Sequence, residues 1–344
     1  MQRSSYRLIA WLAAVLAVAV AVAVPASAAP DNSYTVHPLA SNVPGAAAHV
    51  DPNLVNGWGL TAGPATPWWV SDNGTNQSTL YKADGSVQGL VVQVPVQPTG
   101  TVFWSFTARA IFVFATEKGQ IRGWHPSQGT QTVVLADRSA QGAIYKGLAI
   151  SPAGDRFYAA DFHNGHVDVF DSTTFNLVPD SGFVDPTLPA GYAPFGIQTI
   201  GSRVFVTYAK QGPDAVDEVA GQGRGFVDAY DLAGNLVARV AQHGQLNAPW
   251  GLAWAPDNFG RFSGDLLVGN FGDGQINAYE ELPSGQFVHR GELRTADGKS
   301  LTIDGLWALQ FGHGAPNNGP TNTLFFTAGP NGEADGLFGS ITAP

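Results

Sequence analysis

The chain has 344 residues, no cysteine and a formal charge of −10 at neutral pH. Charged residues make up only 13% of it, whereas glycine (42) and proline (23) are plentiful, which favours many short strands joined by tight turns over helices. An acidic chain without a basic run is not expected to bind nucleic acid or an anionic membrane surface. The lack of cysteine excludes disulfides as a source of stability.

The N-terminus has the pattern of a secretory signal peptide. Arg3 and Arg7 precede an apolar run at residues 9–24, and the small residues 26–28 follow it. The run is shorter than the roughly 20 residues that a membrane-spanning helix needs. We therefore expect residues 1–28 to be a signal peptide and residues 29–344 to form a single exported (secreted) domain. The mature chain would keep 15 basic and 27 acidic residues, a charge of −12, and we expect a monomer.

A glycine that opens a short hydrophobic strand recurs six times, at Gly59, Gly100, Gly147, Gly196, Gly251 and Gly305. The intervals are roughly 40–55 residues, and a repeat of this length with strand chemistry inside each unit is typical of a β-propeller. The sequence therefore predicts an all-β fold, a six-bladed β-propeller.

The two ends of the chain complement each other in this scheme. The last repeat ends at Pro344 after its third strand, and residues 33–37 have the alternation of an extra strand. We expect this N-terminal strand to close the last blade, because closure covers an open sheet edge. Residues 210–224 and 312–322 depart from the repeat, and we expect both loops on one rim.

The repeat also predicts where side chains converge. In each blade the innermost strand begins, and the second strand ends, at the same face of the ring. One ring of side chains at this channel mouth would contain Trp58, Thr99, Lys146, Phe195, Trp250 and Asp304. A second ring would contain Asp72, Thr116, Asp161, Tyr208, Asn270 and Ala328, with Asn56, Asn73, Glu117, His163 and Lys210 close by.

The aromatic members of these rings suggest a ligand site. Trp58, Phe195 and Trp250 would stack on a sugar or another small molecule, and Asn56 and Asn73 would bind its polar groups. The alternative is that the three aromatic rings fill the channel by packing on one another.

The titratable members suggest acid–base chemistry. Lys146, Asp304 and Tyr208 are the candidate catalytic residues, because such groups in a concave site have shifted pKa values. The alternative for Lys146 and Asp304 is a structural ion pair. The sequence has no nucleophile elbow, no zinc-protease motif and no phosphate-binding glycine loop.

Asp72, Asp161 and Asn270 are the candidate metal ligands, since oxygen atoms suit calcium. The alternative is that Asp72 and Asp161 cap their own turns. His163 and His166 flank a turn next to Asp161, either as metal ligands or as part of a solvated hairpin.

Residues 147–171, together with 56–60, 69–74 and 248–252, resemble six-bladed propellers of the NHL-repeat and gluconolactonase-like kind. The chain looks closest to an exported bacterial propeller family of unassigned function. The resemblance implies this fold and export, and the lactonase relatives imply a calcium ion at the channel mouth. Of the matching positions in this sequence only Asp304 carries a carboxylate, with Asn56 one residue further back.

Two functions from different classes follow. The first is an exported propeller that binds a small molecule or glycan at an aromatic channel mouth. The second is a hydrolase, lyase or isomerase, lactonase-like and with or without calcium, that uses the same mouth. A platform for protein partners built on residues 210–224 is a third reading.

Overall fold

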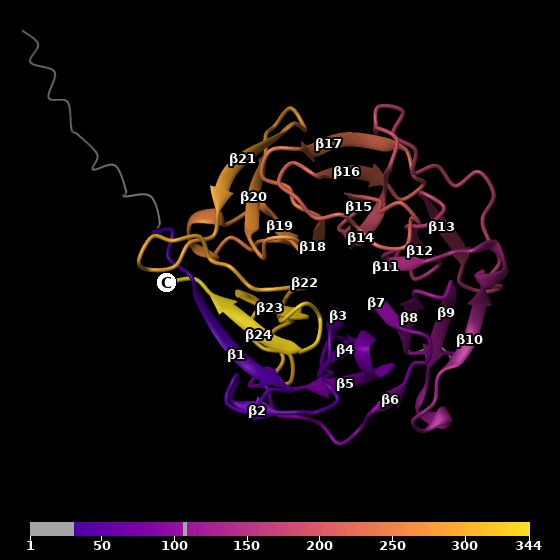
Figure 1. Ribbon diagram of the computed structural model, residues 1–344, viewed down its shortest axis with the longest axis horizontal. Coiled ribbons are helices and arrows are strands. Elements are labelled where there is room, and N and C mark those ends of the chain that lie inside the picture. Colours follow the sequence, from indigo (N-terminus) through magenta and orange to yellow (C-terminus); the bar gives the residue numbers. More distant parts are fainter. Residues whose placement is uncertain (1–30, 106–108) are drawn as a thin grey trace, which may run out of the picture. The chain divides into compact units, whose positions relative to one another are not determined.

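The computed structural model describes residues 31–105 and 109–344, so the expected signal peptide lies outside the described residues. The described chain contains 24 strands and only four short 3-10 helices. Residues 31–344 form one compact unit, in which six sheets are arranged around a central axis (Figure 1). The predicted six-bladed β-propeller is therefore confirmed.

The first three blades follow one another along the chain, and each begins with its innermost strand. Blade 1 contains β3 (Gly57–Thr61), β4 (Trp68–Asp72), β5 (Gln77–Tyr81) and β6 (Val92–Gln93). Blade 2 contains β7 (Pro98–Phe103), β8 (Phe112–Thr116), β9 (Gln120–Trp124) and β10 (Val133–Asp137). Blade 3 has three strands, β11 (Tyr145–Ile150), β12 (Arg156–Asp161) and β13 (His166–Asp171).

The other three blades complete the ring. Blade 4 contains β14 (Tyr192–Ile200), β15 (Arg203–Lys210), β16 (Gly225–Asp231) and β17 (Leu236–Gln242). Blade 5 contains β18 (Pro249–Trp254), β19 (Leu266–Asn270), β20 (Ile276–Glu281) and β21 (Phe287–Glu292). Blade 6 contains β22 (Leu306–Phe311), β23 (Thr323–Ala328), β24 (Leu337–Thr342), β1 (Thr35–Ser41) and β2 (His49–Val50).

The N-terminal strand closes the ring as predicted. β1 pairs antiparallel with β24 and extends further along the chain than the sequence indicated, to Ser41. Figure 1 shows β1 beside β24, close to the C-terminus. The buried Tyr34, just before β1, donates a hydrogen bond of 3.0 Å to the Phe259 carbonyl and stacks on Phe262, both in blade 5. The N-terminal segment therefore joins blade 6 to its neighbour.

Close approach of neighbouring inner strands explains the repeated glycine. A Cβ on Gly59 would lie 2.4 Å from the Thr99 carbonyl oxygen of the next blade, and one on Gly196 would lie 2.1 Å from that of Trp250. No side chain fits at such distances, so the glycine is required by the packing of one blade against the next.

The sixth blade corrects the predicted alignment. Leu306 pairs with Ala328 as Pro249 pairs with Asn270 in blade 5, so the equivalents of Trp250 and Gly251 are Trp307 and Ala308. The predicted position of Asp304 in the inner ring was wrong by three residues. Asp304 is exposed and precedes the strand, where its carboxylate accepts a hydrogen bond from the backbone N–H of Asn331.

The two irregular loops lie on opposite faces of the ring. Residues 210–224 follow the end of a second strand, β15, at the channel mouth, whereas residues 312–322 follow the end of an innermost strand, β22. In the latter loop the Asn318 side chain donates hydrogen bonds to the carbonyls of Gly63 and Pro64, which follow the far end of β3. The expectation of one shared rim was wrong.

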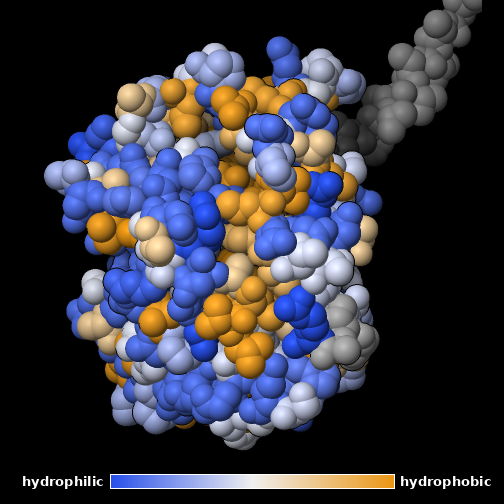
Figure 2. Space-filling model, turned by 90° about the vertical axis from the view of Figure 1, so that its right-hand side faces the viewer, coloured by the Kyte–Doolittle hydropathy of each residue, from blue (hydrophilic) through white to orange (hydrophobic). Residues whose placement is uncertain are grey.

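Buried aromatic and branched side chains fill the spaces between the blades. Figure 2 views the side of the ring that carries β10 and β13, where apolar residues form a band across the surface. Exposed apolar side chains on β10 include Val133 and Val134. None of the helices in the described ranges has the length and apolar character needed to traverse a bilayer.

Candidate functional site

An aromatic cluster occupies the channel where the innermost strands begin. The indole of Trp58 stacks on that of Trp307 with ring centroids 3.6 Å apart, and Trp250 meets both rings edge-on. Phe195, which is fully buried, packs against Trp307 at 5.8 Å. The alternative in which the aromatic side chains pack on one another describes Phe195 and Trp250. Trp307, the central ring of the cluster, was not predicted from the sequence.

Lys146 lies directly above this cluster and is almost completely buried. Its ammonium Nζ is 2.5 Å from Glu117 Oε1, 3.1 Å from Asp217 Oδ1 and 5.2 Å from the ring centre of Trp58. The Trp250 Nε1 donates to the Lys146 carbonyl oxygen over 2.9 Å, which fixes the backbone of this residue. The alternative of a structural ion pair describes Lys146, but its partners are Glu117 and Asp217 and not Asp304.

Lys146 opens onto a pocket of about 290 Å³. Its other lining residues are Trp58, Asn73, Gln97, Glu117, Asp217, Glu218 and Glu333. Trp58 is the only member of the predicted aromatic set that reaches this pocket. The four carboxylates come from three connections between strands, so the acidic character of the pocket is built by loops above the aromatic cluster.

Burial shifts the acid–base behaviour of this pocket. It raises the pKa of Glu218 to about 7, with Lys146 acting in the opposite direction. Burial likewise raises the pKa of Glu333. For Lys146 burial alone favours the neutral amine, but the charge and hydrogen bond of Glu117 outweigh it and raise the pKa of the ammonium. At neutral pH the pocket therefore holds a charged lysine next to a glutamate that can gain or lose a proton.

The two predicted asparagines hold the carboxylates in place. Asn73 donates to Glu117 Oε2 over 3.1 Å, and Asn56 donates to Glu333 Oε2 over 2.9 Å. The Asn56 side-chain oxygen accepts a 3.0 Å hydrogen bond from Trp307 Nε1. Asn56 therefore connects the pocket rim to the aromatic cluster, from a backbone with φ of 49° that asparagine tolerates better than most residues.

The remaining predicted residues lie elsewhere. Tyr208 is buried between blades 3 and 4, where its hydroxyl shares a 2.6 Å hydrogen bond with that of Tyr230, and it does not line the pocket. Asp304 does not line it either. Of the three predicted catalytic residues, the structure brings only Lys146 to the pocket.

The three predicted metal ligands do not act as one group, because Asp161 and Asn270 are each held by hydrogen bonds to neighbouring residues and Asp72 is buried. Asp161 accepts hydrogen bonds from the backbone N–H groups of Ile144 and Asn164, as the turn-capping alternative expects. Asn270 donates to Gln245 and Asp273, and Asp72 is fully buried, which raises the pKa of its carboxyl well above its usual range.

The residues at the channel mouth do not fit the calcium ion implied by the lactonase resemblance. The ammonium of Lys146 already lies between Glu117 and Asp217. Within the described part of the chain, no group of three convergent His, Asp or Glu ligand atoms is found at this pocket. The positive charge that the carboxylates require is supplied here by a lysine.

Comparison with known proteins defines the family. The chain is 32% identical over 334 residues to one uncharacterized protein of Acanthamoeba polyphaga mimivirus, covering 90% of this chain and 80% of that protein. It is 31% identical over 336 residues to a second mimivirus protein, covering 90% of this chain and 86% of the other. The chain therefore belongs to the same family as these viral proteins, and no family model matches it.

Solved structures of low sequence identity share the fold. A glucose dehydrogenase aligns with a TM-score of 0.58 at 13% identity over 90% of this chain and 99% of its own. A streptogramin B lyase aligns with a TM-score of 0.53 at 10% identity over 90% and 98% of the two chains. A putative gluconolactonase aligns at 0.50 and 16% identity over 72% and 78%. These proteins are six-bladed propellers, and at such identities the likeness concerns the fold alone.

Proposed function

We propose that the pocket above Lys146 binds a small polar molecule and acts on it by acid–base catalysis, as a hydrolase, lyase or isomerase. The observation that supports this most directly is Glu218, a pocket-lining carboxyl whose pKa is raised to about 7. A group with a pKa near the working pH is the most effective general acid or base.

Lys146 would have an electrostatic role. Its pKa is raised, so it stays protonated and does not act as a base. A buried ammonium beside the pocket would stabilise negative charge that develops on a substrate oxygen in the transition state. Glu117 and Asp217 would hold the ammonium in position and would not themselves transfer a proton to or from the substrate.

The charge of the pocket restricts the substrate. Four carboxylates and one lysine line it, so an anionic molecule such as a sugar acid or a phosphate ester would be repelled. A neutral sugar, lactone or ester, or a cationic molecule, fits better. Propellers of similar fold include a lyase, a gluconolactonase and a glucose dehydrogenase, which supports the choice of small molecules as candidates.

The test is a hydrolysis screen in a pH-stat with neutral sugar lactones, aryl esters and their cationic analogues. At least one compound should be turned over, with a rate that changes through a midpoint near pH 7. Glu218→Gln should lower kcat by at least a hundredfold, whereas Asp304→Asn, outside the pocket, should match the wild type. Equal rates for Glu218→Gln and the wild type would refute the assignment.

Binding without turnover is the second candidate, and the presence of Trp58 among the pocket-lining residues favours it. In that case a sugar or aromatic compound would raise the melting temperature of the protein, and no compound of the panel would be consumed. Gln97→Ala, which removes a half-buried lining side chain without touching the aromatic cluster, should then weaken the shift.

We further propose that the protein is exported. The support is the signal-peptide pattern of residues 1–28 together with the lack of cysteine, which makes folding independent of the redox state of the compartment. Fractionation of cells that express the full chain, with mass spectrometry of the mature N-terminus, would test this.

A further inference from the structure

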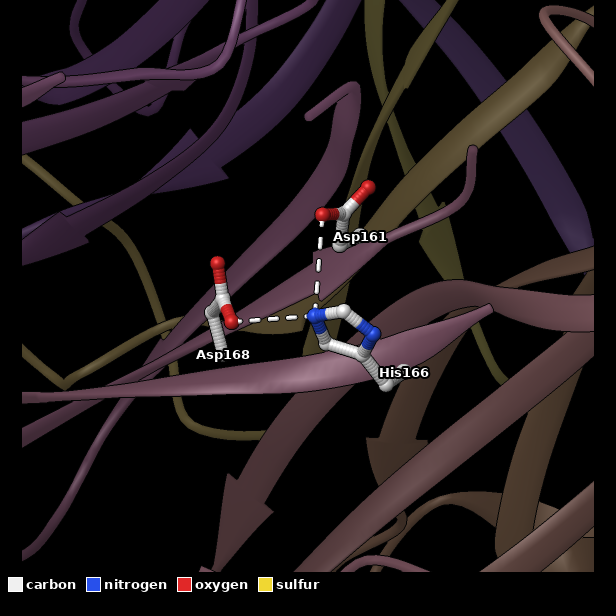
Figure 3. A group of neighbouring side chains, drawn as sticks. All are labelled: Asp161, His166 and Asp168. Carbon is white, nitrogen blue, oxygen red and sulfur yellow. Dashed lines mark hydrogen bonds and ion pairs between the residues drawn. The ribbon is translucent and has the colours of Figure 1, made fainter. Parts of the chain in front are cut away.

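A second group of titratable side chains lies in blade 3, outside the pocket. Asp161 ends β12, His166 begins β13 directly opposite it, and Asp168 follows on the same face of β13. The three side chains converge on one imidazole nitrogen (Figure 3). His166 Nε2 lies 3.1 Å from Asp168 Oδ1 and 3.8 Å from Asp161 Oδ2.

Each carboxylate is held by partners outside this group. Asp161 accepts hydrogen bonds at Oδ1 from two backbone N–H groups and at Oδ2 from Asn164 Nδ2 over 2.8 Å. Asp168 accepts at Oδ2 from the buried hydroxyl of Tyr145 over 2.6 Å, which leaves its Oδ1 for His166. Hydrogen bonds of this kind orient ligands at metal sites and are part of what tunes them.

The distances suit a shared ion. Zinc lies about 2.0–2.2 Å from histidine nitrogen and carboxylate oxygen, so two ligand atoms of one ion are at most roughly 4 Å apart. Both distances from His166 Nε2 lie below that limit, and the three ligand atoms all lie within 4.8 Å of one another. Carboxylate oxygens only accept hydrogen bonds, so a nitrogen that faces two of them carries either a proton or a metal ion.

The two carboxylates of this group are buried and need positive charge beside them. Asp161 and Asp168 are 1% and 5% exposed, whereas the His166 side chain is 50% exposed and leaves one side of the group open to solvent. Arg138 lies nearby, with Nε 3.7 Å from Asp168 Oδ2, the oxygen that faces away from His166. A protonated His166 and this guanidinium would together balance the two carboxylates, and a divalent ion that replaced the proton on Nε2 would supply the same compensation.

We propose that Asp161, His166 and Asp168 bind a divalent transition-metal ion, such as Zn²⁺, on the β12–β13 hairpin. Two carboxylates and one imidazole would supply three ligands, and water would complete the coordination on the exposed side of His166. This site is separate from the pocket above Lys146, so the proposal does not depend on the proposed function.

The test is isothermal titration of the mature chain with ZnCl₂, on protein purified without a polyhistidine tag and freed of metal with EDTA. We expect one Zn²⁺ per chain. His166→Ala should weaken binding at least tenfold, and Tyr145→Phe, which removes only the hydrogen bond to Asp168, should weaken it roughly tenfold. Co²⁺ added in place of Zn²⁺ should give ligand-field absorption bands that His166→Ala loses.

The matched control is His163→Ala. His163 lies on the same hairpin, and its Nδ1 is 3.2 Å from the Ala215 carbonyl oxygen, so it takes no part in the group. This variant should bind Zn²⁺ as the wild type does. The proposal fails if the wild type shows no stoichiometric Zn²⁺ binding, or if His166→Ala binds as tightly as the wild type while circular dichroism shows both to be folded.

Discussion

Glu218 shows how a loop can create an acid–base group on a rigid scaffold. It lies in the irregular segment after β15, which brings it over the aromatic cluster and next to Lys146. Water is partly excluded there, so the charged form of the carboxyl is disfavoured more strongly than Lys146 favours it. The same shift that suits catalysis therefore costs folding free energy once the group is ionised.

The stability of the protein should report this cost. The pKa of Glu218 is about 7 in the folded state against a usual value of 4.5, so between these pH values the folded state binds more protons than the unfolded state. The contribution of Glu218 to the free energy of unfolding therefore falls as pH rises through this window, by at most about 3 kcal/mol. Glu218→Gln should be more stable than the wild type at pH 8 and show no such gain at pH 4.5.

Urea unfolding of both proteins at the two pH values measures this difference. The other titrating groups cancel when the variant is compared with the wild type at the same pH, so the comparison isolates Glu218. A difference in unfolding free energy between the two proteins that is the same at pH 4.5 and pH 8 would contradict the shifted pKa.

Residues within or directly next to the repeated strands were predictable, including Asn56, Asn73 and Glu117, whereas residues further along the loops were not. Lys146 and Trp58 precede the repeated glycine, so the sequence placed them at the channel mouth. Asp217, Glu218 and Glu333 lie in connections between strands, and the conformation of these connections does not follow from the blade repeat. The departure of residues 210–224 from the repeat was the one signal in the sequence that this loop contributes to a functional site.

At the scale of single elements, the N-terminal segment stands out because it comes first in the sequence but belongs to the last blade. β1 adds to the edge of β24, while Tyr34 inserts its ring between Phe259 and Phe262 of blade 5. Sheet pairing and side-chain burial therefore attach this segment to two different blades. Both contacts disappear together if the N-terminus detaches.

Tyr34→Ala should consequently destabilise the whole ring. It removes a fully buried aromatic ring and leaves the Phe259 carbonyl without its hydrogen bond, a loss of about 3–5 kcal/mol by analogy with other buried aromatic truncations. Thr35→Ala, at the next and exposed position of the same segment, should cost less than about 1 kcal/mol. Urea unfolding monitored by tryptophan fluorescence gives both values. Equal effects of the two substitutions would show that Tyr34 does not anchor the closure.

The strands themselves were predictable because their alternation and turn residues are local signals. The sixth blade was misaligned because Ala308 stands where the other five blades have glycine, while Gly305 offered a false match three residues earlier. Gly305 has φ of +65°, so it serves a turn and not the packing of inner strands. Composition alone does not separate these two uses of glycine.

At the scale of the whole molecule, the ring is a closed set of six contacts between inner strands. Five blades approach the next at the position of the repeated glycine, and blade 6 has Ala308 there. Closure by β1 and β24 prevents one contact from widening without compressing the others. The aromatic cluster lies next to these contacts, because the backbone atoms that Gly196 and Gly251 approach are the carbonyl oxygens of Trp250 and Trp307. The width of the channel and the packing of the cluster are therefore coupled.

Gly196→Ala tests this coupling. Its Cβ would lie 2.1 Å from the Trp250 carbonyl oxygen, a backbone atom that cannot rotate away, so blades 4 and 5 must separate. Overpacking of a rigid core costs about 1–3 kcal/mol, and in a closed ring we expect the upper end of that range or more. The movement of Trp250 should also loosen its hydrogen bond to Lys146 and change the fluorescence of the cluster.

Ala308→Gly is the matched control, because it introduces the repeat residue at the one blade that lacks it, and it should cost no more than about 1 kcal/mol. If Gly196→Ala is as stable as this control, the glycines are not required by blade packing, and the close approach of the inner strands is not what sets the repeat.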